Sequence, residues 1–290
     1  MPDFYKYHGL GNDYLVLEPR RFSGVPTAQA VRRICDRNRG MGSDGILWGP
    51  LGESPAGGAF SVRIFNPDGS EAEKSGNGLR IFARFLWDQR YATATPFSIH
   101  TPGGTVGVNI LDEAASRIAM QMGQARFHSS QIPVNGPPRE VLRESLTVGV
   151  RTLTINAASV GNPHCVVLTD APTPELAREL GPLVERHSLF PNRTNVQFMR
   201  VRDEHAIQIE IWERGAGYTL ASGTSSCAAA AVACRLGLCR SPVTVHMPGG
   251  SLEVRLDAQF HIELEGPVSA VCQGDFAAEL LTELGLNRLE

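Results

Sequence analysis

Two stretches of the chain decide its fold, because each reads as a version of the other: IFNPDGSEAEKSGNGLR at Ile64–Arg80 and IWERGAGYTLASGTSSC at Ile211–Cys227. Each begins at an apolar strand end, continues through a glycine-containing loop and reaches a Ser-Gly pair eleven residues after its isoleucine. The two serines, Ser75 and Ser222, are therefore 147 positions apart. A repeat of this length indicates that one structural module occurs twice.

Three further pairs of landmarks keep the same order in the two halves. The spacing between matched positions drifts only from 150 to 144 residues. One glycine-rich match would carry little weight, but four in one order predict a tandem duplication. The pairs are Gly11-Asn12 with Gly161-Asn162, His100 with His246 (each before Pro-Gly-Gly), and Arg117-Ile118 with His261-Ile262.

Composition narrows the class of protein. The chain has 290 residues, of which 42% are hydrophobic and 20% charged, as in soluble globular proteins. A net charge of −3 with scattered arginines argues against nucleic-acid or anionic-lipid partners. No stretch has the apolar length of a membrane span, and the N-terminus lacks a signal-peptide layout. We therefore expect a cytoplasmic protein that acts on a small molecule.

The six cysteines form no Cys-x-x-Cys pair and have no zinc-ligand spacing. We expect free thiols, no metal and no cofactor.

Alternating and β-branched segments predict many strands and few helices. This pattern indicates an α+β fold of two pseudo-symmetric repeats, each a curled, mostly antiparallel β-sheet around a central α-helix. We expect domains at residues 1–119 plus 268–290 and at 120–267, with the active site in the cleft between them. The expected helices cover residues 28–38, 78–89, 174–187, 225–237 and 276–285.

Both repeats place a Ser-Gly pair at the start of the expected central helix. A helix start offers unpaired backbone N–H groups and partial positive charge, which favour an anion. Each serine taken alone is most simply an ordinary N-cap. Two equivalent helix starts that face one cleft favour a carboxylate clamp instead.

These motifs resemble the diaminopimelate epimerase family over nearly the whole length. The matching motifs are HGLGND (8–13), FNPDGSEAEKSGNGLRIFARF (65–85), GNPHCVV (161–167), PNRTNVQFM (191–199), ERGAG with ASGTSSCAAAAVA (213–233) and a late PGG (248–250). The family's fold has two pseudo-symmetric halves, each a curled sheet around a helix, and its members form homodimers. The resemblance therefore implies an isomerase that needs no cofactor and forms a homodimer.

The resemblance also implies roles for individual residues. Two bases flank the substrate α-carbon at Ser75 and Ser222, partnered by His164 and Glu213. Backbone N–H groups would hold the α-carboxylate and stabilise the carbanion; they belong to Gly76, Asn77, Gly223 and Thr224. The remaining substrate contacts, including the distal amino-acid end, correspond to Asn12, Asn66, Asn162, Asn195, Glu213 and Arg214.

The departures from the family pattern concern the chemistry itself. Both base positions are cysteine in the family and serine here, and Tyr218 replaces a glutamate that commonly follows ERGAG. A thiol ionises near pH 8.5, whereas an alkoxide is much harder to form, so serine needs a well-placed partner. Lys74 adjoins Ser75 but is interpreted as a solvated side chain.

Three interpretations of the serine pair remain open. The protein is an engineered variant that traps substrate, a natural relative with activated Ser75–His164 and Ser222–Glu213 pairs, or a binding protein without catalysis. Tyr218 argues against engineering, because a deliberate double Cys→Ser change would not produce it. The leading prediction is epimerisation of LL- to meso-diaminopimelate by two-base 1,1-proton transfer. The alternatives are an isomerase acting on another amino or hydroxy acid and an impaired amino-acid-binding pseudoenzyme.

Overall fold

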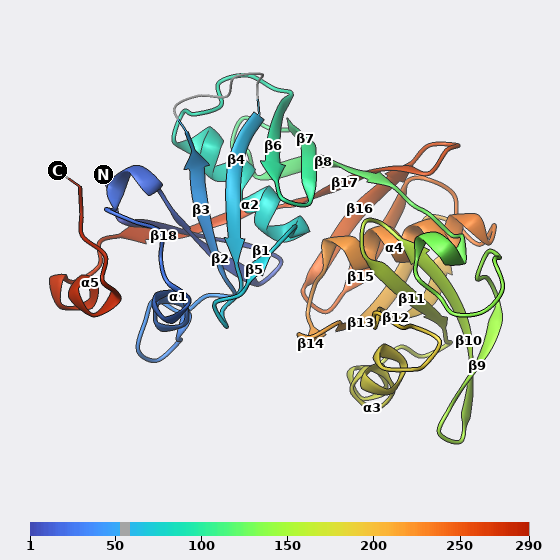
Figure 1. Ribbon diagram of the computed structural model, residues 1–290. Coiled ribbons are helices and arrows are strands. Elements are labelled where there is room, and N and C mark those ends of the chain that lie inside the picture. Colours follow the sequence, from blue (N-terminus) through green and yellow to red (C-terminus); the bar gives the residue numbers. More distant parts are fainter. Residues whose placement is uncertain (53–58, 290) are drawn as a thin grey trace. The chain divides into compact units, whose positions relative to one another are not determined.

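The computed structural model describes residues 1–52 and 59–289 and divides the chain into two compact units (Figure 1). Unit 1 comprises Met1–Met120 with Gly266–Glu290, and unit 2 comprises Gln121–Glu265. Residues 53–58 and 290, which the predicted N-terminal domain includes, lie outside the described residues. No helix in the described part of the chain is long and apolar enough to cross a membrane.

Unit 1 surrounds one long helix, α2, with strands from both ends of the chain. The turn between β1 and β2 places Leu10 and Gly11 at φ 56° and 86°, as in a two-residue hairpin, and Asn12 follows at once as the first residue of β2. The elements are β1 Phe4–Gly9, β2 Asn12–Leu17, η1 Pro19–Arg21, α1 Ala28–Cys35, β3 Ile46–Leu51, β4 Ala59–Phe65, β5 Glu71–Ala72, α2 Gly76–Asp88, β6 Phe97–Thr101, β7 Gly104–Ile110, β8 Arg117–Gln124, β18 Ser269–Gly274 and α5 Ala278–Leu284.

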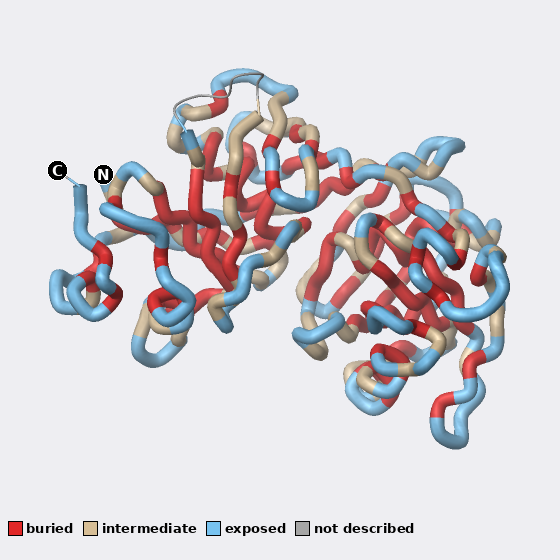
Figure 2. The backbone as a smooth tube through the Cα atoms, in the orientation of Figure 1, coloured by how far each residue is buried: buried red, intermediate tan, exposed pale blue. Residues whose placement is uncertain are grey.

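Unit 2 is built around helix α4, and the sequence of this helix explains its central position. Five of its thirteen residues are alanine, and Cys227 to Ala233 are completely buried, so strands approach the helix on several sides. Figure 1 shows α4 among these strands, and Figure 2 shows their buried backbone in red. The elements are η2 Ser129–Gln131, β9 Glu144–Val148, β10 Arg151–Ser159, β11 Pro163–Leu168, α3 Pro174–Glu185, β12 Asn195–Asp203, β13 Ala206–Glu213, β14 Gly217–Thr219, α4 Gly223–Arg235, β15 Val243–Met247, β16 Gly250–Leu256 and β17 His261–Pro267.

Strand pairing is the same in the two units, which confirms the predicted duplication. In unit 1, β2 pairs in parallel with β3, β3 antiparallel with β4, and β4 in parallel with β6. In unit 2 the same relations join β11 to β12, β12 to β13 and β13 to β15. Even the register agrees: Ser61 lies opposite His100, and Gln208 lies opposite His246. The predicted α+β class with repeated sheets around a central helix is confirmed.

Helix α3 packs against the strand that leads to Glu213. A Cβ atom added at Gly181 would lie 2.5 Å from Cγ of the Trp212 ring, so only glycine allows this contact. The Trp212 indole donates to Glu185 Oε2 at 2.8 Å, and Gly215 N donates to Glu185 Oε1 at 3.3 Å. The helix is thereby bonded to β13 and to the turn that follows it.

Gly181→Ala is expected to lower the free energy of unfolding by about 1–3 kcal/mol, because the added methyl overpacks the α3–Trp212 contact. Urea denaturation followed by circular dichroism measures the change. Gly24→Ala is the matched control, since a Cβ there meets nothing within 4 Å. Equal stability of the two variants would contradict the prediction.

Candidate active site: two half-sites at the helix starts

Ser75 caps helix α2 in unit 1. It precedes the helix with extended backbone, and its Oγ accepts the Gly78 N–H at 3.1 Å. The Tyr14 hydroxyl lies 3.2 Å from the same Oγ, in a hydrogen bond that either atom could donate. Because Ser75 already occupies the Gly78 N–H, the N–H groups of Gly76 and Asn77 in this first turn are the ones available to an anion.

The side chains of Asn12 and Asn77 are held by a chain of hydrogen bonds. Asn12 Nδ2 donates to Asp44 Oδ2 at 2.9 Å, and Asp44 is ion-paired with Arg37 at 2.8 Å. Asn77 Nδ2 donates to Asn12 Oδ1 at 3.1 Å, and Asn77 Oδ1 accepts from Arg80 at 2.7 Å. Two predicted site residues therefore contact each other, beside the start of α2.

Asn66 lies at the other end of the repeated segment, in the turn between β4 and β5. Its Nδ2 donates to Ser70 Oγ at 2.9 Å, and its carbonyl accepts the Gly69 N–H at 2.9 Å. Within the described residues, these hydrogen bonds join Asn66 to Ser70 and Gly69 and not to Asn12 or Asn77. Its side chain therefore stabilises this turn.

Ser222 begins helix α4 in unit 2 but does not cap it. Its side chain makes no capping hydrogen bond, so the N–H groups of Gly223 and Thr224 are not covered by this hydroxyl. The Ser222 hydroxyl hydrogen-bonds the Glu213 carboxylate instead. Burial raises the pKa of Glu213, and the hydrogen bond from Ser222 offsets part of that shift. A carboxylate of raised basicity in contact with a hydroxyl is the arrangement that general-base catalysis needs.

His164 lies at the start of β11, completely buried, with both ring nitrogens engaged. Its Nε2 is 2.9 Å from Asn162 Oδ1 and its Nδ1 is 3.1 Å from Gln197 Nε2, which also donates to Ser225 Oγ at 3.0 Å. These contacts assign the proton to Nε2, with Nδ1 accepting from Gln197. Loss of solvation, together with the charge of Arg214, lowers the pKa of His164 to about 3. The ring is therefore neutral and holds the Asn162 side chain.

This depressed pKa predicts acid sensitivity. Below about pH 6.5 the unfolded chain protonates His164, whereas the folded chain does so only near pH 3, so stability falls as pH falls through this window. Between pH 7 and pH 5 the expected loss from this residue is about 2 kcal/mol. Urea denaturation of wild type and His164→Gln at both pH values measures it. Identical pH slopes for the two proteins would contradict the assignment.

Asn195 and Arg214 are joined by a backbone contact. Asn195 Oδ1 accepts the Arg214 N–H at 3.0 Å, and its Nδ2 donates to the Pro163 carbonyl at 2.9 Å. Asn195 thus ties the loop that carries Arg214 to the start of β11, with both ends of its amide occupied. The Arg214 residue is exposed, and its guanidinium donates to the Asn192 carbonyl at 3.1 Å. Its remaining donors suit a carboxylate ligand.

Tyr218 has a role inside unit 2 that accounts for the departure from the family pattern. Its hydroxyl donates to Glu210 Oε2 at 2.7 Å, and the Arg178 guanidinium lies 4.2 Å from its ring centroid. Burial and the neighbouring carboxylate raise the pKa of Tyr218 to about 12, and burial raises that of Glu210. Tyr218 therefore stabilises the β13–β14 hairpin through Glu210.

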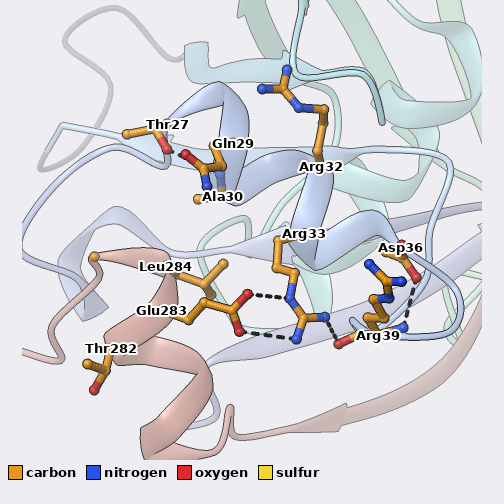
Figure 3. Close-up of a pocket in the computed structure, with 11 residues that line it drawn as sticks. Thr27, Gln29, Ala30, Arg32, Arg33, Asp36, Arg39, Thr282, Glu283 and Leu284 are labelled. Atoms are coloured by element: carbon orange, nitrogen blue, oxygen red, sulfur yellow. Dashed lines mark hydrogen bonds and ion pairs between the residues drawn. The ribbon is translucent and has the colours of Figure 1, made fainter.

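A surface cavity of about 420 Å³ in unit 1 is separate from these residues (Figure 3). It lies between α1 and α5, where Arg33 is ion-paired with Glu283 at 2.7 Å and donates to the Arg39 carbonyl. None of the predicted site residues lines it. In the described part of the chain, no group of three or more histidine, cysteine or acidic side chains is placed to hold a metal ion.

Comparison with known proteins decides the family. The model of the diaminopimelate epimerase family matches residues 4–128 and 156–271. A Nostoc sp. protein named diaminopimelate epimerase 2 is 53% identical over 277 residues, which cover 96% of each chain. The chain belongs to the diaminopimelate epimerase family. The diaminopimelate epimerase of Pelotomaculum thermopropionicum is 38% identical over 282 residues, covering 94% of this chain and 98% of that one.

Solved structures with the same fold extend beyond the diaminopimelate epimerase family. A probable proline racemase from Agrobacterium radiobacter K84 has a TM-score of 0.69 at 16% identity, covering 96% of this chain and 93% of that chain. A hydroxyproline epimerase from Agrobacterium vitis has a TM-score of 0.67 at 15% identity, covering 93% of this chain and 90% of that chain. At these identities the likeness shows the fold alone. The predicted family and fold are confirmed.

Three residues at the half-sites were missed from the sequence: Tyr14, Asp44 and Gln197. The repeat itself contained a signal for Tyr14, because Asn12 matches Asn162 and therefore Tyr14 matches His164. Asp44 lies 32 positions from Asn12 and Gln197 lies 33 positions from His164, so only the parallel strand pairs bring them together. Sequence spacing carries no sign of such contacts.

Proposed function

We propose that the protein epimerises LL-diaminopimelate to meso-diaminopimelate by two-base 1,1-proton transfer without a cofactor. The observation that carries the proposal is family membership, with 53% identity over 96% of the chain to a protein named diaminopimelate epimerase 2. Support from the half-sites comes from two helix starts, each with a serine hydroxyl in contact with a second acid–base side chain. Ser75 and Ser222 occupy the positions that the resemblance gives to the two bases.

In the proposed reaction, Ser75 and Ser222 act on opposite faces of the same α-carbon. The Glu213 carboxylate accepts the Ser222 proton as the Ser222 oxygen takes the proton from carbon. The N–H groups of Gly76, Asn77, Gly223 and Thr224 would hold the substrate carboxylate and stabilise the carbanion. Arg214, with Asn12, Asn66, Asn162 and Asn195, would contact or support the rest of the substrate.

The Ser75–His164 pair stays a prediction. In unit 2 the His164 nitrogens are engaged by Asn162 and Gln197, and the ring is neutral. This environment supports a positioning role for His164 through Asn162, in place of the proton acceptor first expected.

Incubation with LL- or meso-diaminopimelate in D₂O tests the function. The expected result is deuterium at the α-carbon and conversion of each isomer into the other, followed by proton NMR and chiral chromatography. Neither exchange nor conversion at high protein concentration would overturn the catalytic proposal. Calorimetric binding without exchange would then identify an amino-acid-binding protein, and exchange on another amino or hydroxy acid alone would identify a different isomerase.

We further propose that the protein acts as a homodimer in the cytoplasm, in the formation of lysine and peptidoglycan precursors. This rests on the family resemblance. Sedimentation equilibrium of the purified chain gives its mass directly, and a mass of about 31 kDa at all concentrations would contradict the dimer.

A further inference from the structure

The hydroxyl of Tyr14 lies 3.2 Å from the Ser75 oxygen, within unit 1. Tyr14 lies on β2 and is 6% exposed, so its ring is fixed by packing. Ser75 Oγ is simultaneously bonded by the Gly78 N–H at 3.1 Å. This oxygen therefore has two hydrogen-bond partners, one of which can exchange a proton with it.

The backbone leaves a space for the Tyr14 ring at Gly45. A Cβ added to Gly45 would lie 2.6 Å from Tyr14 Cε1 and 3.0 Å from Cδ1. Gly45 also precedes β3, and its carbonyl accepts the Leu15 N–H at 3.1 Å, next to Tyr14 in sequence. The pairing of β2 with β3 thus sets the direction in which the phenol extends.

The residues around Tyr14 differ from those around its counterpart in unit 2. The equivalent of Tyr14 in unit 2 is His164, whose ring accepts from Gln197, which in turn bonds Ser225. Strand register places Leu47 opposite Val16 and Gln197 opposite Val166, so Leu47 is the equivalent of Gln197. The equivalent of Ser225, three residues after the serine, is Gly78. Leu47 has an apolar side chain and Gly78 has none, so the hydrogen bonds that Gln197 makes to His164 and Ser225 in unit 2 have no counterpart at these two positions of unit 1.

We propose that Tyr14 is the proton-relay partner of Ser75, as Glu213 is of Ser222; this inference rests on the proposed function. When Ser75 acts as base, its oxygen takes the α-proton while its own proton passes to the Tyr14 phenolate, and the C–H electron pair stays on the α-carbon. In the reverse direction, the Tyr14 phenol returns a proton to Ser75 as the Ser75 hydroxyl protonates the carbanion. One proton enters and one leaves Ser75 in each direction.

The test compares Tyr14→Phe with wild type for both isomers in D₂O. Epimerisation is expected to fall about a hundredfold or more in both directions, the usual contribution of a positioned acid–base group. Exchange of the α-proton should survive for the single isomer that Ser222 deprotonates, because the Ser222–Glu213 side is intact. Ser222→Ala should show the opposite pattern, with exchange retained only for the other isomer.

Tyr7→Phe is the matched control. Tyr7 lies on β1 opposite Tyr14, is 3% exposed, and donates its hydroxyl to Asp88 at 3.1 Å. Its loss should change thermal stability without favouring exchange of one isomer. If Tyr14→Phe lowers exchange of both isomers equally, as a structural defect would, the relay is overturned; retention of full epimerisation overturns it equally.

Site-specific incorporation of a fluorotyrosine at position 14 provides a second measurement that preserves the ring. A more acidic phenol should shift one limb of the kcat/KM pH profile to lower pH in proportion to its acidity, whereas a profile identical to wild type overturns the relay. Wild-type protein that exchanges neither isomer refutes the proposed function and the relay together. Active wild type with an unaffected Tyr14→Phe variant refutes the relay alone.

Discussion

A Ser75→Cys, Ser222→Cys double variant is expected to epimerise diaminopimelate at least about a hundredfold faster than the wild type. Both positions begin helices, and a helix start lowers the pKa of a cysteine below its usual value of about 8.5. The thiolate is the reactive form, so near-neutral pH supplies a base that an alcohol provides only through its partner. Each tenfold gain corresponds to about 1.4 kcal/mol of activation free energy.

The measurement is the rate of meso-isomer formation from LL-diaminopimelate, with substrate affinity determined by calorimetry. The backbone N–H groups that would hold the carboxylate are unchanged, so the affinity should stay the same while kcat rises. Ser23→Cys, at an exposed serine of unit 1, controls for the presence of an added thiol. A double variant that binds substrate normally yet is no faster than wild type would show that these helix starts are not arranged for proton transfer.

Glu213→Gln is expected to reduce epimerisation about a hundredfold or more, because the amide cannot accept the Ser222 proton. The amide can still hydrogen-bond Ser222, so the fold should be retained. The pKa of Glu213 is raised by burial, so the ionised base is lost as pH falls from a point above the usual glutamate range. In wild type, kcat/KM should therefore decline on the acid side at that raised value.

The acid-side decline should disappear in Glu213→Gln. Glu210→Gln is the matched control, because Glu210 lies on the same strand, also has a raised pKa, and contacts Tyr218 instead of Ser222. This control should retain both the rate and the acid-side decline. If the acid-side decline of kcat/KM disappeared in Glu210→Gln and remained in Glu213→Gln, the assignment of Glu213 as the partner of Ser222 would be contradicted.

The duplication was predictable because glycines and serines at turns and helix starts recur at nearly constant spacing. The five helices were predicted from their apolar patterns, with starts off by two residues at α2, α4 and α5. Helices α2 and α4 begin earlier than predicted, directly after Ser75 and Ser222, whereas α5 begins later. Among the strands, β1, β2, β3, β9 and β18 were not predicted, and neither were the short β5 and β14. The two or three residues of these short strands are too few for an alternating pattern, and pairing with β4 and β13 is what makes them strands.

The sequence indicated which residues belong to the two half-sites, but it did not indicate which of them contact each other. The pairing of Ser222 with Glu213 was implied by the family resemblance, whereas the contact of Ser75 with Tyr14, which crosses 61 positions, was not predicted. The resemblance also implied His164 as the partner of the base Ser75; in unit 2 its ring is buried and neutral, with both nitrogens engaged. Hydrogen-bond partners of buried side chains depend on strand register, which local sequence does not specify.

The oxygen of Ser75 belongs to the architecture of helix α2 as well as to the proposed chemistry. Sulfur is a weak acceptor, so a cysteine here would cap the helix less well, at a cost of up to about 1 kcal/mol, whereas the uncapped position 222 would be indifferent. At position 75, therefore, the more acidic thiol would be the better base but the poorer helix cap, whereas position 222 has no such conflict. Selection for a stable helix α2 would favour serine at position 75, and the Tyr14 phenol would then compensate for the lower acidity of the serine hydroxyl.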